Sequence, residues 1–336
     1  MSARRLILPV FIPHLGCPHH CVFCDQRFIS GQQRPVTSEE VRALVRQAAA
    51  LPRSGAERQL AFYGGSFTAV PEAYQLSLLE AGWEAVREGL VDSLRLSTRP
   101  DAIDEKILER LRAYGVRTIE LGAQSMDEEV LRLSGRGHSA EDVRRAAGLI
   151  REAGFELILQ MMTGLPGDTE AKSLFTAKEL IALQPDGVRI YPTVVVLGTE
   201  LYELWLSGEY REHSVEDAVE LCAKLLPLFD SAGIPVIRLG LNPTKELSSG
   251  LAAAGAYHPA LGELVKSRVL LNQARTILRE IPAGSVVRLG VRSSLFSQAL
   301  GHHRQNLESL RREYPLLDLE LVPVEDAQEP LFLLKE

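Results

Sequence analysis

Three cysteines lie close together near the start of the chain, at Cys17, Cys21 and Cys24, with the spacing C-x3-C-x2-C. Cysteine thiolates are the usual ligands of iron–sulfur clusters, and each of the three can bind one iron of a cubane cluster. The fourth iron would keep an open coordination position, which is typical of a catalytic rather than a structural metal site. The spacing therefore favours a catalytic [4Fe–4S] cluster on this loop.

Zinc or reactive thiols are the alternatives that the cysteines alone leave open. A structural zinc site needs four ligands, and His19 or His20 could provide the fourth. Zinc ligands usually come as two pairs separated by a spacer, whereas the only other cysteine of the chain is Cys222. Because leucines surround Cys222 in a segment of helical period, we expect it to be a buried core thiol.

The segments that must position the cysteines alternate between short apolar runs and longer stretches of helical period. The predicted strands are Leu6–Ile12, Gln59–Tyr63, Ser93–Ser97, Arg117–Leu121, Phe155–Met161, Gly187–Tyr191 and Val236–Leu239. The predicted helices begin at Thr37 and Ser139, each with an acidic residue three positions on, and cover Pro71–Glu88, Asp101–Tyr114, Thr169–Leu183 and Ser214–Ala232. Strand–helix alternation predicts a parallel sheet with crossover helices. We therefore expect an α/β fold in which residues 1–241 form a partial (β/α)6 barrel.

The pattern changes near residue 242, where glycines and a proline mark irregular chain. Beyond it we expect a small α+β extension over residues 242–336. Its predicted elements are helices at Glu263–Arg279 and Leu295–Arg312 and strands at Ser285–Val291, Leu316–Leu321 and Pro330–Leu334. His302 and His303 would lie on the solvated surface of the second helix.

Composition excludes several classes of protein. The chain has 336 residues, of which 46% are hydrophobic and 24% charged, as in ordinary globular proteins. No apolar run approaches the roughly 18 residues of a membrane span, and Pro9 and Pro13 interrupt the first one, so we predict a strand there rather than a signal peptide. Three clustered cysteines among four do not form a disulfide framework, which indicates a reducing cytoplasm.

Charge is distributed unevenly along the chain. The net charge of −7 argues against a protein coated for nucleic acid, yet residues 264–312 contain nine Lys and Arg against two Glu. A local basic surface can supply phosphate contacts even on an acidic protein. A solvated helix face is the alternative interpretation of the same stretch.

A glycine-rich or polar loop follows each of the first six predicted strands. In parallel βα architectures these loops meet at the carboxyl ends of the strands, where ligands bind. They are Gly64–Thr68, Thr98–Asp101, Gly122–Ser125, Gly164–Asp168 and Tyr191–Thr193, besides the cysteine loop. Their convergence predicts one site.

Each loop also has a purely structural interpretation. The glycines could form tight turns, and Ser125 could be the N-cap of a helix over Met126–Leu133. Arg136 and His138 could be surface residues, although an arginine there could equally clamp a carboxylate with two parallel donors.

Within the cysteine loop, Phe23 directly precedes the third cysteine, Cys24. An aromatic residue occupies this position in the radical S-adenosylmethionine (SAM) superfamily, which the chain resembles. More specifically, the chain resembles the Elongator catalytic-subunit-like branch. The matching strings are GGSFT at 64–68, STRPD at 97–101, GAQS at 122–125, RGHS at 136–139, GLPGDT at 164–169, RIYPT at 189–193 and YHPALGELVKSR at 257–268. The Elongator subunit also has an acetyltransferase domain, which we do not expect before Glu336. Oxygen-independent coproporphyrinogen oxidase is a more distant resemblance.

The resemblance implies a radical SAM barrel and assigns roles to residues of this chain. Cys17, Cys21 and Cys24 would hold a [4Fe–4S] cluster whose open iron binds the amino and carboxylate groups of SAM. The implied SAM contacts are Gly64 and Gly65 for the amino group, Gln124 and Ser125 for the ribose and methionine, Arg136 for the carboxylate, and Met162 and Gly164 for the adenine. Ser66, next to the glycine pair, is also expected to bind the cofactor.

The implied reaction is reductive cleavage of SAM to a 5′-deoxyadenosyl radical, which removes a hydrogen atom from a substrate. The electron would come from a flavodoxin-like or ferredoxin-like donor, and the resemblance together with the basic stretch favours tRNA or another RNA as substrate. A coproporphyrinogen-oxidase-like enzyme is the second hypothesis. A non-catalytic zinc or nucleic-acid binding module is the third.

Overall fold

The computed structural model describes residues 5–12, 17, 20–24, 34–50, 55–242 and 250–334. The chain divides into two compact units. The first comprises Met1–Ser214 and Phe229–Tyr257, and the second comprises Val215–Leu228 and His258–Glu336. The second unit thus includes part of the helix that the sequence predicts over Ser214–Ala232.

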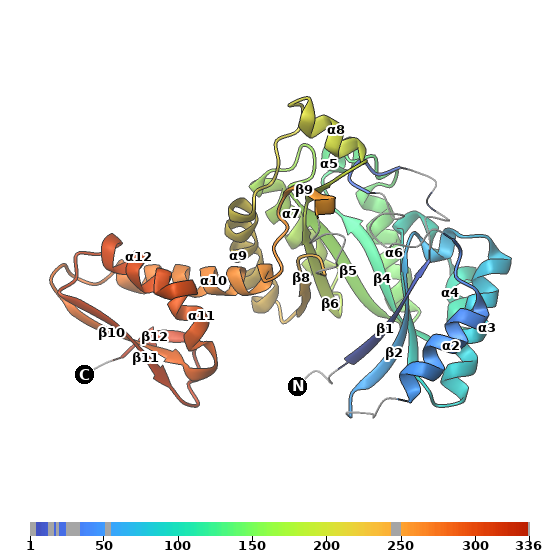
Figure 1. Cartoon of the computed structure of the whole chain (residues 1–336), viewed down its shortest axis with the longest axis horizontal. Helices are drawn as coiled ribbons and strands as arrows, with labels where there is room; N and C mark the ends of the chain where they lie inside the picture. Colours follow the sequence, from blue (N-terminus) through green and yellow to red (C-terminus); the bar gives the residue numbers. More distant parts are fainter. Residues whose placement is uncertain are drawn as a thin grey trace. The chain divides into compact units, whose positions relative to one another are not determined.

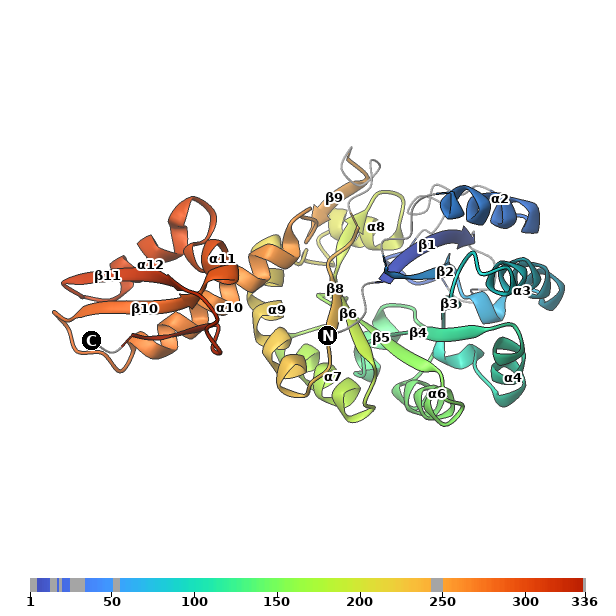
Figure 2. The same ribbon diagram turned by 90° about the horizontal axis from the view of Figure 1, so that it is seen from below.

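A seven-stranded parallel sheet forms the centre of the first unit, in the order β1-β2-β3-β4-β5-β6-β8. The strands are β1 (Arg5–Ile12), β2 (Glu57–Gly64), β3 (Ser93–Thr98), β4 (Val116–Gln124), β5 (Glu156–Thr163), β6 (Gly187–Pro192) and β8 (Val236–Leu239). The sheet curls, and helices cover its outer face (Figure 2). The predicted α/β class and partial barrel are confirmed.

Six described α-helices lie between the first six strands of the sheet. They are α2 (Ser38–Ala49), α3 (Glu72–Arg87), α4 (Glu105–Ala113), α5 (Glu128–Leu133), α6 (Ala140–Glu152) and α7 (Glu170–Ala182). Five of the six begin at a side-chain N-cap, and α3, which follows Pro71, is the exception. Thr37 and Ser139 form the two predicted capping boxes. The prediction for α4 was wrong at its start, because Asp104 rather than Asp101 caps the helix and Pro100–Ala102 forms a separate 3-10 turn.

The two faces of the sheet differ in polarity. On the outer face, alternate strand residues are fully buried against the helices: Leu60, Phe62, Leu94, Leu96, Ile119, Leu121, Leu157 and Leu159. The inner face contains charged and amide side chains, among them Arg95, Glu120 and Gln160, of which Glu120 and Gln160 line a cavity. The barrel interior is therefore polar, which the apolar character of the runs did not predict.

A short segment beyond β6 covers the end of the sheet where the strands finish. It contains β7 (Val194–Val196), which pairs with β9 (Ala252–Gly255), and α8 (Glu200–Leu206). Figure 1 shows α5 and α8 at this end of the unit.

The second unit contains a three-stranded sheet in the order β11-β10-β12. Its strands are β10 (Val286–Arg292), β11 (Asp318–Val324) and β12 (Leu331–Leu333), and its helices are the first part of α9 (Val215–Ser231), α10 (Leu261–Leu278), α11 (Phe296–Leu300) and α12 (Gln305–Glu313). Cys222 of α9 is fully buried, as predicted. Within the described ranges, no helix has both the length and the apolar character needed to cross a membrane.

The prediction of a single helix over Leu295–Arg312 was wrong. The chain breaks at Gly301, which has a φ of +74°, and His303 and Arg304 adopt left-handed backbone conformations. Glycine is the residue that most readily leaves a helix in this way. His302 and His303 are therefore exposed on a turn between α11 and α12 rather than on a helix.

Candidate active site

A cavity of about 540 Å³ opens at the carboxyl ends of the strands of the first unit. Its lining includes seven of the predicted site residues: Cys17, Cys21, Cys24, Gly64, Gly65, Gln124 and Arg136. These residues come from four loops, and the first and last of them, Cys17 and Arg136, are 119 positions apart in the sequence. The convergence inferred from the loops is therefore present for this set.

Backbone hydrogen bonds on both sides of Val22 fix the cysteine loop. The N–H of Val22 donates to the carbonyl of Ser134 (3.1 Å), and the N–H of Leu201 donates to the carbonyl of Val22 (2.7 Å). Between the cysteines, the N–H of Cys24 donates to the carbonyl of Cys21 (3.0 Å). The side chain of Val22 packs in an apolar cluster with residues of β7 and α8. The cysteine loop is thus held by two segments distant in sequence.

Arg136 lies directly against this loop and is only 7% exposed. Its Nη1 donates to the Sγ of Cys21 (3.2 Å) and its Nη2 donates to the carbonyl of Gly122 (2.7 Å). Its Nε is buried without a hydrogen-bond partner among the described residues. Arg99 donates to the carbonyl of Arg136 (2.6 Å) and forms two hydrogen bonds with Asp101 (2.8 and 3.0 Å).

Gly64 ends β2 where no other residue fits. Its φ is +97°, and a Cβ atom there would lie 2.2 Å from the carbonyl oxygen of Ile12 on β1. Glycine tolerates both the left-handed conformation and the close approach. The following Ser66 is buried, and its Oγ lies 2.8 Å from the Oγ1 of Thr98 and accepts the N–H of Arg99 (3.2 Å). Ser66 therefore joins two loops and does not line the cavity.

The side chains of Gln124 and Ser125 have different surroundings although the two residues are adjacent in the sequence. Gln124 has a left-handed φ of 64°, lines the cavity, and accepts a hydrogen bond from Gln160 (3.1 Å). The Oγ of Ser125 lies 3.2 Å from the Oγ1 of Thr176 in the buried layer behind the sheet. The N-cap of α5 is Asp127, so the alternative that Ser125 caps this helix was wrong.

Met162 and Gly164 lie outside the cavity lining. Met162 is half-buried near the end of β5. The N–H of Gly164 donates to the Asp168 carboxylate (2.8 Å), and its carbonyl accepts the Tyr210 hydroxyl (2.6 Å). Both backbone polar groups of Gly164 are therefore already engaged.

A group of ionised and phenolic side chains that the sequence analysis missed lies on the inner face of the sheet. Glu120 of β4 is 3% exposed and accepts hydrogen bonds from Arg95 (2.7 Å), Arg189 (2.9 Å) and Tyr63 (2.7 Å). Arg189 also donates to Tyr191 (3.1 Å). Charged residues within otherwise apolar strands were the available signal, because such residues are rarely buried unless they are paired.

Comparison of the sequence with known protein families identifies the superfamily of this chain. Residues 11–179 match the model of the radical SAM superfamily, and residues 185–270 match that of the radical SAM C-terminal domain. The chain belongs to the radical SAM superfamily. Because the first match covers the cysteine loop and the loops after β2 to β5, it includes most of the cavity.

Individual relatives confirm the resemblance to the Elongator-like branch. Elongator complex protein 3 of Mus musculus is 30% identical over 302 residues, which cover 76% of this chain and 54% of that protein. A tRNA uridine(34) acetyltransferase of Methanocaldococcus infernus is 30% identical over 255 residues, covering 64% and 48%. The chain thus spans about half the length of the curated relatives it matches.

Two solved structures share the fold of this radical SAM chain. The archaeal Methanocaldococcus infernus Elp3 with an N-terminal deletion aligns with a TM-score of 0.64 and 24% identity, covering 81% of this chain and 64% of that one. Coproporphyrinogen III oxidase (HemN) from Escherichia coli aligns with a TM-score of 0.50 and 20% identity, covering 69% and 53%. At these identities the likeness concerns the fold.

The radical SAM superfamily implies a [4Fe–4S] cluster and SAM, and the cavity fits both. Within the part of the chain that the structure describes, no three His, Cys, Asp or Glu side chains are grouped around one point as a single ion needs. A cubane cluster binds each cysteine at a different iron, so its ligands need not meet at one point. For SAM, the unpartnered Nε of Arg136 and Nη1 of Arg99 are two buried donors that an anion could satisfy.

The surroundings of Cys17 favour the protonated form of its thiol. Burial raises the pKa of the Cys17 thiol, and the neighbouring Cys21 raises it further. Arg99, Arg136 and the N–H of Ser66 oppose this effect only in part. Since thiolates are the metal ligands, binding of a cluster must release protons at this site.

His138 should make the stability of the first unit depend on pH. It is 7% exposed, and burial together with the nearby Arg136 lowers its pKa to about 3. The unfolded chain binds this proton below a pH of about 6.5, so the free energy of unfolding should fall by a few kcal/mol as the pH decreases from about 6.5 towards 3. Urea titrations at several pH values should show a weaker dependence in His138→Gln. Parallel profiles would contradict this assignment.

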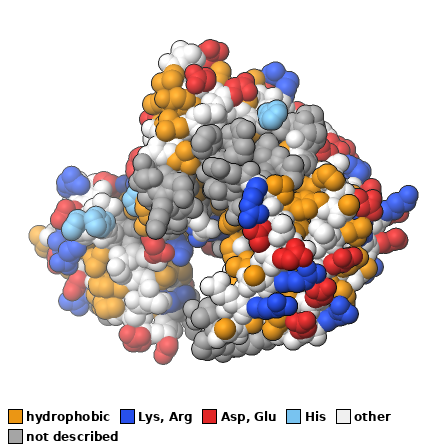
Figure 3. Space-filling view, turned by 45° about the vertical axis from the view of Figure 1, so that its right-hand side comes forward, with side chains coloured by type: hydrophobic (Ala, Val, Ile, Leu, Met, Phe, Trp, Pro, Cys, Tyr) orange, Lys and Arg blue, Asp and Glu red, His pale blue; other side chains and the backbone are white. Residues whose placement is uncertain are grey.

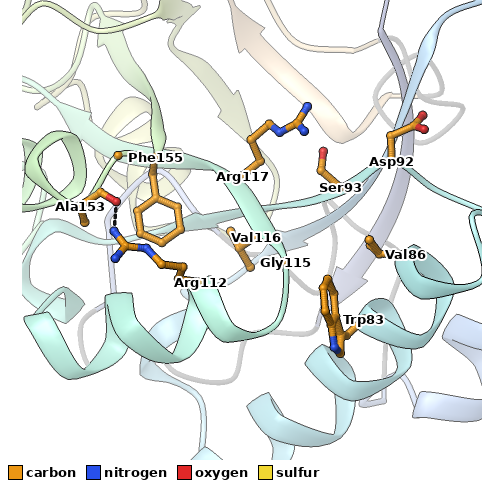
Figure 4. A pocket seen from close by; sticks show the side chains of 11 residues that line it. Trp83, Val86, Asp92, Ser93, Arg112, Gly115, Val116, Arg117, Ala153 and Phe155 are labelled. Atoms are coloured by element: carbon orange, nitrogen blue, oxygen red, sulfur yellow. Dashed lines mark hydrogen bonds between the residues drawn. The ribbon is translucent and has the colours of Figure 1, made fainter.

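A second cavity, of about 290 Å³, lies at the opposite end of the sheet, where β3 and β4 begin. Figure 4 shows Trp83, Phe155 and Arg112 around it. Arg112 lies over the ring of Phe155 (5.7 Å to the centroid) and donates to the carbonyl of Ala153. None of the predicted site residues lines this cavity, so we assign no part of the radical SAM site to it.

Proposed function

We propose that the chain binds a [4Fe–4S] cluster through Cys17, Cys21 and Cys24 and uses it to cleave SAM reductively, so that a 5′-deoxyadenosyl radical can remove a hydrogen atom from a substrate. The observation that carries this proposal is the cavity shared by the three cysteines with Gly64, Gly65, Gln124 and Arg136. A structural metal site would not require a cavity of this size beside its ligands.

The residues of the chain bind and shelter the cofactors in this proposal. The sharp end of β2 at Gly64 and Gly65 leaves backbone groups unblocked by side chains, so that they can approach the amino group of SAM. The buried donors of Arg99 and Arg136 would face its carboxylate. The apolar cluster around Val22 excludes water from one side of the cysteine loop, which protects a reactive intermediate.

Anaerobic reconstitution of the purified protein tests this function. The product should be brown and contain about four irons per chain, and incubation with dithionite and SAM should yield 5′-deoxyadenosine and methionine. A protein that stays colourless with all three cysteines intact, or a loaded protein that never cleaves SAM, would contradict the proposal. Because the cluster needs reduced thiols, we propose that the protein works in a reducing cytoplasm. Because the reaction needs an electron, we propose a flavodoxin-like or ferredoxin-like electron donor.

We propose an RNA, of the tRNA class, as substrate. One relative is named a tRNA uridine(34) acetyltransferase, and the side of the cavity formed by β6 and β8 contributes Arg189, Tyr191 and Arg238. Arginines and tyrosines are the side chains that bind phosphates and stack on unpaired bases. Arg238 has no carboxylate partner among the described residues and donates to two carbonyls, at 3.0 and 2.9 Å.

The basic stretch 264–312 supports RNA binding less than the sequence suggested. Seven of its nine basic side chains form ion pairs or hydrogen bonds, for example Arg275 with Glu313 (2.7 Å) and Arg268 with Glu216 (2.8 Å). Of the nine, only the side chains of Arg279 and Arg304 form no hydrogen bond or ion pair with the described residues, and both are exposed. On the face shown in Figure 3, basic and acidic side chains are intermixed.

A salt titration of tRNA binding distinguishes the two unpaired arginines from the paired ones. If Arg279 and Arg304 contact phosphates, the double variant Arg279→Gln/Arg304→Gln should lower the slope of log K against log[KCl] by about two, because each phosphate contact releases about one counterion. The control Arg275→Gln/Arg288→Gln removes the same charge from ion-paired positions and should leave the slope nearly unchanged. No tRNA binding at low salt would exclude RNA as the substrate.

A further inference from the structure

We propose that Arg136 sets the reduction potential of the cluster by donating a hydrogen bond to the sulfur of Cys21, a role separate from any contact with SAM. This inference rests on the proposed function, because it requires Cys21 to be a cluster ligand. It concerns the electron-transfer step that precedes all later chemistry. Arg136 acts on the cluster through Cys21, so it is a positioning residue rather than a catalytic one.

The contact between the two residues is direct and buried. The Nη1 of Arg136 lies 3.2 Å from the Sγ of Cys21, and the two residues are 7% and 9% exposed. In such a setting solvent screens a charge weakly, so a guanidinium acts strongly on a neighbouring sulfur.

The charge of Arg136 is directed at the sulfur because no carboxylate competes for it. Two arginines line this part of the cavity, and the other, Arg99, is neutralised by two hydrogen bonds with Asp101. Arg136 forms no ion pair with any carboxylate in the described ranges; its remaining bonded partner is the carbonyl of Gly122 (2.7 Å). Once Cys21 is a ligand thiolate, its sulfur becomes the anionic partner of Arg136.

The backbone around Arg136 holds the guanidinium in this place. Ser134 accepts the N–H of Val22, so the two segments are bonded to each other beside the cysteine. At Gly135, with a φ of +64°, a Cβ atom would lie 2.8 Å from the carbonyl oxygen of His20, so only glycine permits this approach. The carbonyl of Arg136 in turn accepts a hydrogen bond from Arg99 (2.6 Å).

A donor of this kind stabilises the reduced cluster more than the oxidised one. Reduction adds one negative charge to the cluster and its sulfurs, and both a hydrogen bond to sulfur and a nearby cation favour that charge. Loss of Arg136 should therefore make the potential more negative even when SAM is absent. A residue that only clamped the carboxylate of SAM would leave the SAM-free potential unchanged.

The test is a redox titration of the SAM-free, reconstituted full-length protein, followed by EPR of the reduced cluster. In Arg136→Gln, the equilibrium constant for one-electron reduction should fall about tenfold, which equals a shift of about 59 mV. Arg136→Lys keeps the charge but cannot reach both Cys21 and Gly122, so its shift should be smaller. The control Arg132→Gln removes the same charge from an exposed position on α5 and should titrate like the wild type. An unchanged potential in loaded Arg136→Gln would overturn the inference.

A second measurement remains decisive if Arg136→Gln fails to load iron. Electron–nuclear double resonance of the reduced wild-type cluster in H2O and D2O should reveal an exchangeable proton coupled to the cluster, and the signal should be lost in Arg136→Lys or Arg136→Gln, whichever loads. Absence of that proton from the wild type would overturn the inference while leaving the proposed function intact. A wild type that binds no cluster at all would instead contradict the proposed function.

Discussion

Replacing Cys17, Cys21 or Cys24 singly with serine should lower 5′-deoxyadenosine formation at least about 1000-fold, equivalent to about 4 kcal/mol of activation free energy. All three thiols line the cavity, and a serine hydroxyl does not provide the thiolate that binds iron. Iron content after anaerobic reconstitution and the yield of 5′-deoxyadenosine are the two measurements. We expect both to fall together, because the reaction needs the cluster.

The matched control for these variants is Cys222→Ala. It also removes one sulfur, but from a fully buried position in α9 that is not part of the cavity lining. Its iron content and SAM cleavage should equal those of the wild type. If all three loop variants kept about four irons and normal cleavage, the assignment of the cluster to this loop would be wrong.

Glu120→Gln should destabilise the first unit by about 3–5 kcal/mol, because it removes the carboxylate that pairs with the buried guanidinium of Arg95 and the partly buried one of Arg189. Arg95 and Arg189 lie 2.7 and 2.9 Å from this carboxylate. Without it, the only ion pair of Arg95 among the described residues would be the longer one with Glu156 (3.9 Å), beside its hydrogen bond to the neutral Gln59 (3.0 Å). Tyr63, whose pKa is raised by burial and by Glu120, would keep only a neutral amide oxygen as its acceptor.

Tryptophan fluorescence in a urea titration can measure this change. Both tryptophans of the chain, Trp83 and Trp205, lie in the first unit, so their signal reports its unfolding. The control Glu72→Gln removes an exposed partner of Arg110 and should change the stability by less than about 1 kcal/mol. A loss of stability of similar size in both variants would show that Glu120 does not stabilise the first unit through its buried contacts.

Local signals in the sequence were sufficient for much of the barrel. Thr37 and Ser139 specify helix starts by capping, and the loop after each strand could be placed because parallel strands end on the same side. Positions that depend on distant partners could not be found in this way. The pairing of Glu120 with Arg95 and Arg189 joins three strands, and each residue alone appears as an irregularity in an apolar run.

The same limit applies within the site. Ser66 and Ser125 occur in loops that meet the cavity, yet their hydroxyls bond to neighbouring loops, and nothing in their immediate sequence distinguishes them from Gln124. Arg136 has the residue type expected of a carboxylate clamp, and only the fold shows that one of its nitrogens lies against Cys21. Similarly, Gly301 permits the break between α11 and α12, but nothing in the sequence marks His303 and Arg304 as residues that adopt a left-handed backbone.

The bonds on either side of Val22 have a consequence for biosynthesis. The loop that carries the cysteines is completed by Ser134 and by Leu201, which are translated more than a hundred residues later. A nascent chain that has exposed only its first hundred residues therefore has the thiols but not the frame that orients them. We expect iron delivery to follow translation of at least the first two hundred residues, so that the growing polypeptide passes through an interval in which its sulfurs can be oxidised.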